Sequence, residues 1–264
     1  MKTVRQSLLT ICAAVATICA GTVNADADEH VRLVTLVQDA DYAPFMTAQE
    51  DGPAGIYAEI IKEADKRLPG YKIELTSAPW TRAKFLVQSG KVNGLVGTYH
   101  KPIRRPWIRH FSTPMATETI YVYCRQGVAQ DHWEYPKDYA GLLFSNNAGF
   151  STPGAEFFEM VLNGKIQLIE EQTTDANLRL LQIGRADCYV QQQEAVELSI
   201  QSNNFDKIKP IREVHTETAH IGYSQHWSAE DGDTFIADMD SVLKQMTADG
   251  TIRKIIMICT VGTI

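Results

Sequence analysis

The chain has 264 residues, a formal net charge of −7 and 44% hydrophobic residues. Its acidic balance excludes strong electrostatic attraction to nucleic acid or to an anionic membrane surface. The hydrophobic content is sufficient for a proper core, and the length fits one large domain or two lobes.

The first 25 residues are typical of a secretory signal peptide. Lys2 and Arg5 give a positive start, residues 8–20 form an apolar run, and small residues precede a cleavage point after Ala25. A membrane anchor is the alternative, but the run is shorter than the roughly 20 apolar residues needed to cross a bilayer. We therefore expect an exported, soluble protein whose net charge, without the two basic residues, is −9.

The cysteines add two points about export. A lipoprotein signal is a further alternative, because Cys12 and Cys19 lie in the apolar run, but each follows an isoleucine where a small residue is expected. Three cysteines then remain, namely Cys124, Cys188 and Cys259, so an oxidising compartment allows at most one internal bridge. Their spacing fits no zinc pattern, and we expect neither a metal nor a cofactor.

The remaining chain alternates strands and helices, which predicts sheets covered by helices. The expected strands are 31–37, 72–76, 92–98, 119–124, 142–145, 166–169, 187–191 and 220–224. The expected helices are 55–68, 80–89, 153–162, 174–183, 193–201, 233–246 and a short last helix ending near 259.

Two units of this α/β pattern follow each other without a flexible linker. We expect them to form two lobes, 29–117 together with 222–264 and 121–216. The chain would cross between the lobes twice, with 119–124 and 220–224 as the hinge strands, which favours closure about a hinge.

Several short motifs occur in a fixed order in the chain. In the first half they are Tyr42-Ala-Pro-Phe45, Gly52-x-x-Gly55, Pro79-Trp80, Gly90-Lys-Val-Asn-Gly94 and Arg105-x5-Phe111-Ser-x-Pro114. In the second half they are Gly149-Phe-Ser-Thr152, Gly184-Arg-Ala-Asp-Cys-Tyr189 and Ala248-Asp-Gly-Thr-Ile-Arg-Lys254. As an ordered set covering almost all of the mature chain, they resemble the family 3 periplasmic solute-binding proteins.

This resemblance implies the type II periplasmic-binding-protein fold, an α/β fold with two lobes. It also implies a periplasmic, monomeric receptor that captures an amino acid or a related organic anion between the lobes. A membrane ABC transporter permease would be its partner. The ligand itself cannot be named from the motifs.

Arg105 stands six residues before Phe111, where the family has its carboxylate-binding arginine. A guanidinium group matches a carboxylate with two parallel hydrogen bonds and stays charged when it is buried. The alternative is an exposed surface charge, since Arg104 and Arg109 are close by.

Tyr42 and Trp80 match the two aromatic residues that enclose a ligand's side chain in the family. Their large faces offer apolar area and, to a cation, an electrostatic attraction. Core packing is the alternative for both. Asp39 matches a pocket acid of some members, with the capping of a turn as its alternative.

Four more residues match family positions that contact the ligand. Thr98 and His100 follow a predicted strand, although His100 replaces a small hydroxyl residue and has a structural role as its alternative. Ser151 and Thr152 precede Pro153 at a predicted helix start, where free N–H groups favour an anion and where either residue would also serve as the helix cap.

Two positions depart from the family pattern. Gln192 stands where the family has the carboxylate that binds an amino group, so an amino acid would depend on Asp39 or Glu194 for charge pairing. Arg82 follows Trp80 and either adds a cation to the cleft or lies on a helix surface. Both departures favour an organic anion or a ligand with two acidic groups.

Two other functions remain possible at this point. One is a sensory module that presents its ligand to a signalling partner. The other is an enzyme of the cyclohexadienyl dehydratase type, for which Glu194 is the only nearby general acid. We expect a receptor and not an enzyme.

Overall fold

The computed structural model describes residues 31–261. The predicted signal peptide, residues 1–25, lies outside this range. Within it, no helix combines the length and hydropathy that a membrane span requires.

One mixed sheet of nine strands runs through the described part of the chain, in the order β10-β9-β11-β8-β12-β6-β1-β5, with β7 also paired to β12. Its strands are β1 (Arg32–Asp39), β5 (Tyr71–Ala78), β6 (Gly94–Tyr99), β7 (Ile108–Phe111), β8 (Ala116–Arg125), β9 (Leu143–Asn147), β10 (Gln167–Glu171), β11 (Cys188–Gln192) and β12 (Ile208–Ser224). A small sheet holds β2 (Asp41–Tyr42), β3 (Met46–Gln49) and β4 (Gly52–Ala54). The helices are α1 (Ile56–Lys66), α2 (Trp80–Gln88), a short 3-10 turn (Lys137–Tyr139), α3 (Ala155–Leu162), α4 (Thr174–Gln182), α5 (Gln193–Asn203), α6 (Ala229–Ala248) and α7 (Thr251–Val261).

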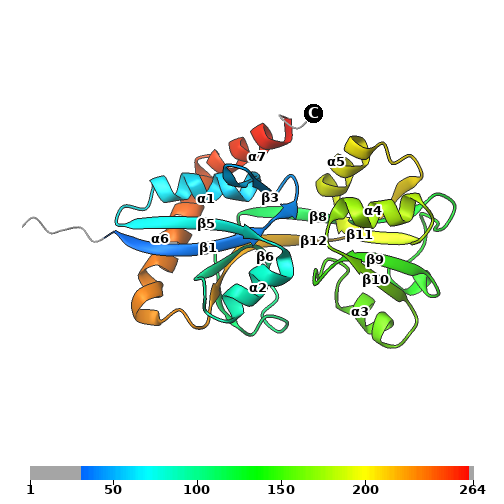
Figure 1. The fold of residues 1–264 in the computed structure, drawn as a ribbon, viewed down its shortest axis with the longest axis horizontal. Helices are drawn as coiled ribbons and strands as arrows, with labels where there is room; N and C mark the ends of the chain where they lie inside the picture. The colour runs from blue at the N-terminus through cyan, green and yellow to red at the C-terminus, as the bar shows by residue number, and fades with distance from the viewer. Residues whose placement is uncertain (1–30, 262–264) are drawn as a thin grey trace, which may run out of the picture. The chain divides into compact units, whose positions relative to one another are not determined.

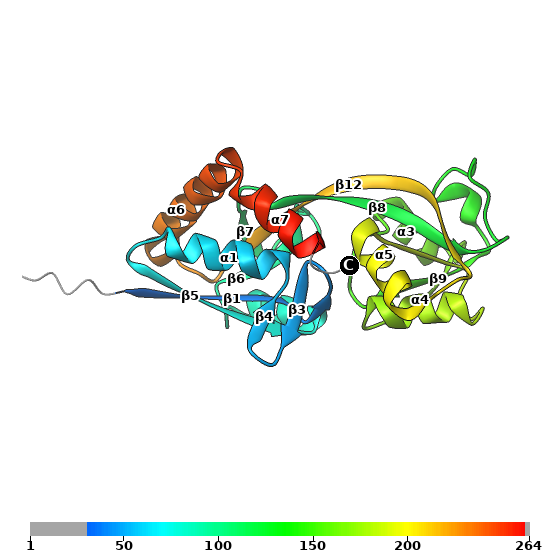
Figure 2. The same cartoon turned by 90° about the horizontal axis from the view of Figure 1, so that it is seen from above.

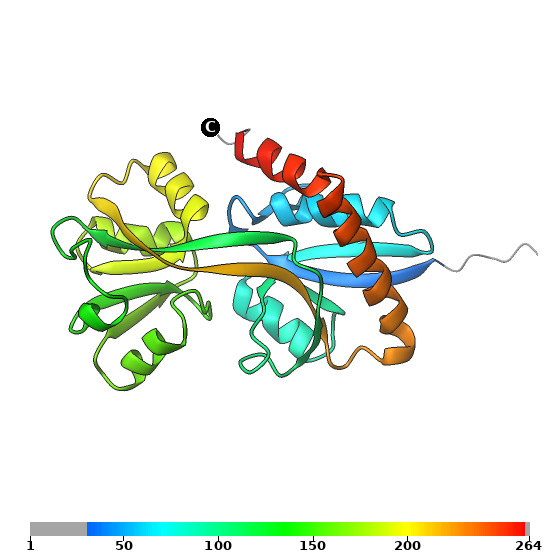
Figure 3. The same ribbon diagram turned by 180° about the vertical axis from the view of Figure 1, so that it is seen from behind.

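Two long antiparallel strands, β8 and β12, join the two ends of this sheet (Figure 1). We call one end the β1 half, with β1, β5, β6, β7, α1, α2, α6 and α7, and the other the β9 half, with β9, β10, β11, α3, α4 and α5. Strand β12 pairs with β6 through residues 219–223, and β8 pairs with β11 through residues 120–124. The crossing segments are therefore 116–119 and 216–219, which Figures 2 and 3 show as neighbouring strands between the halves. The prediction of an α/β fold with two connecting strands is confirmed. The segments expected as hinges, 119–124 and 220–224, lie in these two strands but mostly pair with β11 and β6, so the crossing comes earlier in each strand.

Each half has its own apolar core. In the β1 half, α1 and α6 pack their buried faces on the sheet, with Ile60, Phe235 and Leu243 among the fully buried side chains. In the β9 half, a disulfide joins Cys124 on β8 to Cys188 on β11, which are directly paired residues of the two strands. This bridge is compatible with the oxidising compartment that the sequence predicts.

The second glycine of the Gly52-x-x-Gly55 motif fixes the loop that follows Tyr42 and β2. Gly55 precedes α1 with a φ of 101°, and a Cβ there would lie 2.6 Å from the carbonyl oxygen of Phe45. This close approach lets the Tyr57 N–H donate to the Phe45 carbonyl at 3.0 Å. The start of α1 thereby holds the loop that follows β2.

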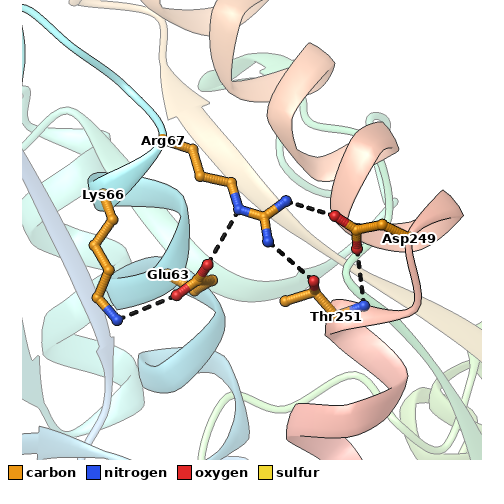
Figure 4. A network of polar contacts seen from close by, with 5 residues as sticks. All are labelled: Glu63, Lys66, Arg67, Asp249 and Thr251. Carbon is orange, nitrogen blue, oxygen red and sulfur yellow. Dashed lines mark hydrogen bonds and ion pairs between the residues drawn. The ribbon is translucent and has the colours of Figure 1, made fainter.

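A polar network ties α7 to α1 (Figure 4). Arg67, at the end of α1, donates to Asp249 at 2.7 Å and to Thr251 at 2.9 Å, and its Nε lies 3.1 Å from Glu63. Asp249 also accepts from the Thr251 N–H at 2.9 Å, so the network fixes the turn between α6 and α7.

The structure corrects one helix start and adds several strands. The helix expected from Pro153 begins at Ala155, because Gly154 takes a φ of 87° just before it, so neither Ser151 nor Thr152 caps it. The small β2–β3–β4 sheet and β7 were not expected. Strand β12 starts at Ile208 and not near 220, because its first part alternates exposed and half-buried residues that resemble a loop in sequence.

Candidate functional site

Arg105 is buried in the loop between β6 and β7, with 6% of its surface exposed. Its Nη1 donates to the hydroxyl of Thr98 and, at 3.1 Å, to the carbonyl oxygen of Tyr99. Its Cζ lies 5.5 Å from the ring centroid of Trp80, which is within the range of a cation–π contact. The Thr98 hydroxyl, the Tyr99 carbonyl and the Trp80 ring therefore fix the orientation of the guanidinium group.

Within residues 31–261, the guanidinium group of Arg105 forms no ion pair with a carboxylate. The nearby acid Glu217 is bound instead by Lys101 at 2.5 Å and by His215 at 3.2 Å. Burial lowers the pKa of Arg105 to about 10, so it stays charged at neutral pH. An unpaired buried charge costs several kcal/mol, and an anionic ligand would offset that cost.

Two cavities meet at Arg105, and both are lined by residues from both halves. The smaller has a volume of about 20 Å³ and is lined by Tyr42, Met46, Trp80, Gly97, Tyr99, Arg105, Phe150 and Ser151. The larger has a volume of about 410 Å³ and is lined by Thr81, Lys84, Phe85, Gln88, Arg104, Arg105, Trp107, Gly149, Phe150, Ser151, Phe158 and Glu170. The candidate site therefore lies between the halves, at the ends of β6 and β9.

The larger cavity is predominantly basic. Lys84 lies one turn after Trp80 on α2, and its ammonium group donates to the Gly149 carbonyl at 2.7 Å, across from one half to the other. Burial, and then the charge of Arg105, lower the pKa of Lys84. Arg104 lies 5.0 Å from the ring centroid of Phe158. Among the described residues, Lys84, Arg104 and Arg105 line this cavity together with one acid, Glu170.

Two residues that line the small cavity each have a buried polar atom without a hydrogen-bond partner in the described range. These atoms are the indole Nε1 of Trp80 and the Oγ of Ser151. Both can donate a hydrogen bond. Together with Arg105, they form a set of donors that suits an oxyanion.

The two predicted aromatic residues also meet at this cavity. The ring of Phe150, from the β9 half, lies 5.5 Å from the ring of Tyr42 and 5.4 Å from that of Trp80. Phe150 thus contacts both of the rings that the family resemblance assigns to the binding of a ligand.

Glu118 on β8 holds one wall of the cavity. It is fully buried and accepts hydrogen bonds from Tyr42 at 2.7 Å, from Tyr99 at 2.6 Å and from Tyr57. Burial raises its pKa, and the three tyrosine donors partly offset that rise. The cluster links the crossing strand β8 to the loop of Tyr42, to α1 and to β6.

The other predicted residues of the β1 half are spread over different positions. Thr98 is buried and positions Arg105, as described above. His100 is exposed, and its ring packs 4.7 Å from that of Phe111. Arg82 lies on the exposed face of α2, and neither it nor His100 lines the two cavities.

Asp39 is buried at the end of β1 and lines neither cavity. Its carboxylate accepts from the Asp41 N–H at 3.3 Å, which is the turn-capping role given as its alternative. Burial raises its pKa to about 6, partly offset by the N–H groups of Asp41, Ala40 and Trp80.

In the β9 half, two predicted residues have intramolecular partners. Thr152 donates to the Val190 carbonyl at 3.1 Å. Gln192 caps α5, since its Oε1 accepts from the Ala195 N–H at 2.8 Å, and its Nε2 donates to Glu194. Ser151 alone of the three predicted residues here lines both cavities.

Three residues of the site were not predicted from the sequence. Lys84 could have been found from its spacing, because a residue four after Trp80 shares a helix face with it. Phe150 and Glu118 gave no such signal, since their partners come from distant parts of the chain.

The model of the bacterial extracellular solute-binding proteins, family 3, matches residues 34–257. No curated protein is significantly similar to the chain.

Several solved structures share the fold. A histidine kinase sensor domain with similarity to periplasmic binding proteins superposes with a TM-score of 0.72 at 20% identity, over 86% of this chain and 95% of that one. An ancestral arginine-binding protein bound to arginine gives 0.72 at 18% identity, over 86% and 97%. The arginine-, lysine-, histidine-binding protein ArtJ from Geobacillus stearothermophilus gives 0.68 at 19% identity, over 85% and 93%.

The tyrosine cluster yields a first prediction. Replacing Glu118 by Gln places an amide donor against tyrosine donors, and we expect the free energy of unfolding to fall by about 1–3 kcal/mol. Urea unfolding measures this. The control Glu213→Gln, at an exposed position of β12, should change it by less than about 0.5 kcal/mol. Equal effects of the two substitutions would contradict the role of Glu118.

Asp39 yields a prediction on pH. Its pKa is raised from 3.8 to about 6, so the unfolded state ionises first as the pH rises, and stability from this group is lost between about pH 4 and pH 6. We expect Asp39→Asn to gain up to about 3 kcal/mol relative to wild type across this window. Urea unfolding at several pH values tests this, with the exposed Glu74→Gln as control. A difference between Asp39→Asn and wild type that is constant with pH would contradict it.

Proposed function

Because the chain belongs to family 3 of the bacterial extracellular solute-binding proteins, we propose that it is a periplasmic receptor for a small carboxylate-bearing molecule. The ligand would bind between the β1 half and the β9 half and be delivered to a membrane ABC transporter permease. The protein would act as a monomer.

The observation that carries this proposal is the buried, charged and unpaired Arg105. Its fixed orientation leaves a guanidinium edge for a carboxylate, and such a pair is both strong and directional. Ser151 and Trp80 supply further donors from opposite halves.

The charges around Arg105 favour an anion over an amino acid. Lys84 and Arg104 line the same cavity and suit a second acidic group. Among the described residues, no acid lines the small cavity, and Glu170, the one acid that lines the larger cavity, already accepts from the Gly149 N–H at 3.1 Å. Both polar atoms of Gln192 are also hydrogen-bonded within the protein. Burying an unpaired ammonium is costly.

Closure would couple binding to delivery. Residues of both halves line the site, so a ligand contacts all of them only when the halves are together, and binding shifts the equilibrium to that state. We place the lobes at 29–117 with 222–264 and at 121–216, with the crossing segments of β8 and β12 as the hinge.

A sensory role is the second candidate, supported by the shared fold of the histidine kinase sensor domain. In that case the closed protein would act on a signalling partner. An enzyme is less well supported, because Glu194, the candidate general acid, is hydrogen-bonded to Gln192. Consumption of arogenate or prephenate would favour it.

A pair of ligands that differ only in an amino group tests the proposal. In calorimetric titrations of protein refolded from denaturant, to remove any co-purified ligand, we expect succinate to bind at least as tightly as aspartate. Arg105→Gln should weaken succinate binding at least about 30-fold, or about 2 kcal/mol, because it removes the charge that meets the carboxylate.

The controls separate binding from folding. Arg185→Gln removes an exposed arginine and should leave the affinity unchanged. Ligand-free Arg105→Gln should be no less stable than wild type, since it removes a buried unpaired charge. An unchanged succinate affinity in Arg105→Gln would sink the carboxylate assignment, and a tenfold preference for aspartate would sink the preference for anions.

A further inference from the structure

Phe150 belongs to the β9 half, yet its side chain packs in the β1 half. Its ring contacts Tyr42 edge-on at 5.5 Å and Trp80 at 5.4 Å. It also packs against the two apolar clusters that contain Tyr42 and Trp80. Both rings of the aromatic pair therefore contact a side chain of the protein itself.

The turn that carries Phe150 is firmly held. The Phe150 N–H donates to the Asn147 carbonyl at 2.9 Å, and the Phe150 carbonyl accepts from the side chain of Asn146 at 3.2 Å. Gly149 takes a φ of 72°, and its N–H donates to Glu170 at 3.1 Å. Lys84 binds the Gly149 carbonyl from the other half. The ring is thus placed by contacts on both sides of the site.

This ring decides how much space remains beside Arg105. The cavity that it shares with Tyr42, Trp80 and Arg105 has a volume of about 20 Å³, which is room for about one water molecule. The larger cavity, which Arg105, Phe150 and Ser151 also line, has about 410 Å³ and is basic. A ligand of any size must therefore approach Arg105 from the basic cavity.

We propose that Phe150 is a specificity-determining residue, which fills the slot between Tyr42 and Trp80 and so excludes ligands with a bulky apolar group. The ligand is then a compact anion, bound by Arg105 and the other cations of the basic cavity, with Phe150 as one wall. This inference rests on the proposed function, because it specifies the ligand class of the same site.

Two dicarboxylates that differ by one benzyl group test the inference. Wild-type protein should bind succinate at least tenfold more tightly than benzylsuccinate in calorimetric titrations. In Phe150→Ala the slot is empty, and we expect benzylsuccinate to gain at least tenfold while succinate changes by less than threefold. Phe150→Leu, which keeps an apolar side chain in the slot, should stay close to wild type. The exposed Leu162→Ala controls for the loss of an apolar residue.

A neutral probe separates this inference from the proposed function. Indole carries no charge, so its uptake does not depend on Arg105. We expect indole to raise the unfolding temperature of Phe150→Ala but not of wild type. If neither dicarboxylate binds to any variant, the anion proposal fails for these ligands while indole still decides on Phe150.

Two results would overturn the role of Phe150. One is wild-type protein that binds benzylsuccinate as tightly as succinate, which would mean that the ring moves out of the slot freely. The other is a Phe150→Ala variant, folded by circular dichroism, that gains affinity for neither benzylsuccinate nor indole.

Discussion

The candidate site depends on one buried guanidinium. Arg105 is oriented by the Thr98 hydroxyl and the Tyr99 carbonyl, and it stays charged despite its burial. No acid of the described chain pairs with it at ion-pair distance. A buried charge without a partner costs stability, and in the proposed function the binding of an anion would offset that cost.

Three other residues, Glu118, Lys84 and Phe150, hold the parts of the site around Arg105 together. Glu118 anchors Tyr42 from the crossing strand, so the aromatic wall is connected to the segment about which the halves would move. Lys84 and Phe150 each reach from one half to the other. Lys84 supplies a polar contact between the halves, and Phe150 supplies an apolar one. In the proposed function, the cations would attract the ligand and the aromatic contacts would limit its shape.

The sequence predicted the fold better than it predicted the site. The alternation of strands and helices and the ordered motifs were enough for the architecture, and the spacing to Phe111 pointed to Arg105. Glu118 was not predicted, because an acid within a strand is expected to be exposed and its three tyrosine partners are distant in sequence. Phe150 was not predicted for a similar reason, since its neighbours belong to the other half. Arg82 lies on the exposed face of α2, which is the second of the two positions expected for it, whereas Lys84 shares the helix face of Trp80 and lines the larger cavity.

The most direct test of the central claim is a crystal structure of the protein with succinate bound. The account predicts a carboxylate of the ligand within about 3 Å of the Arg105 guanidinium nitrogens, with the second carboxylate on the side of Lys84. Succinate bound elsewhere, with Arg105 paired to an acidic side chain of the protein, would contradict it.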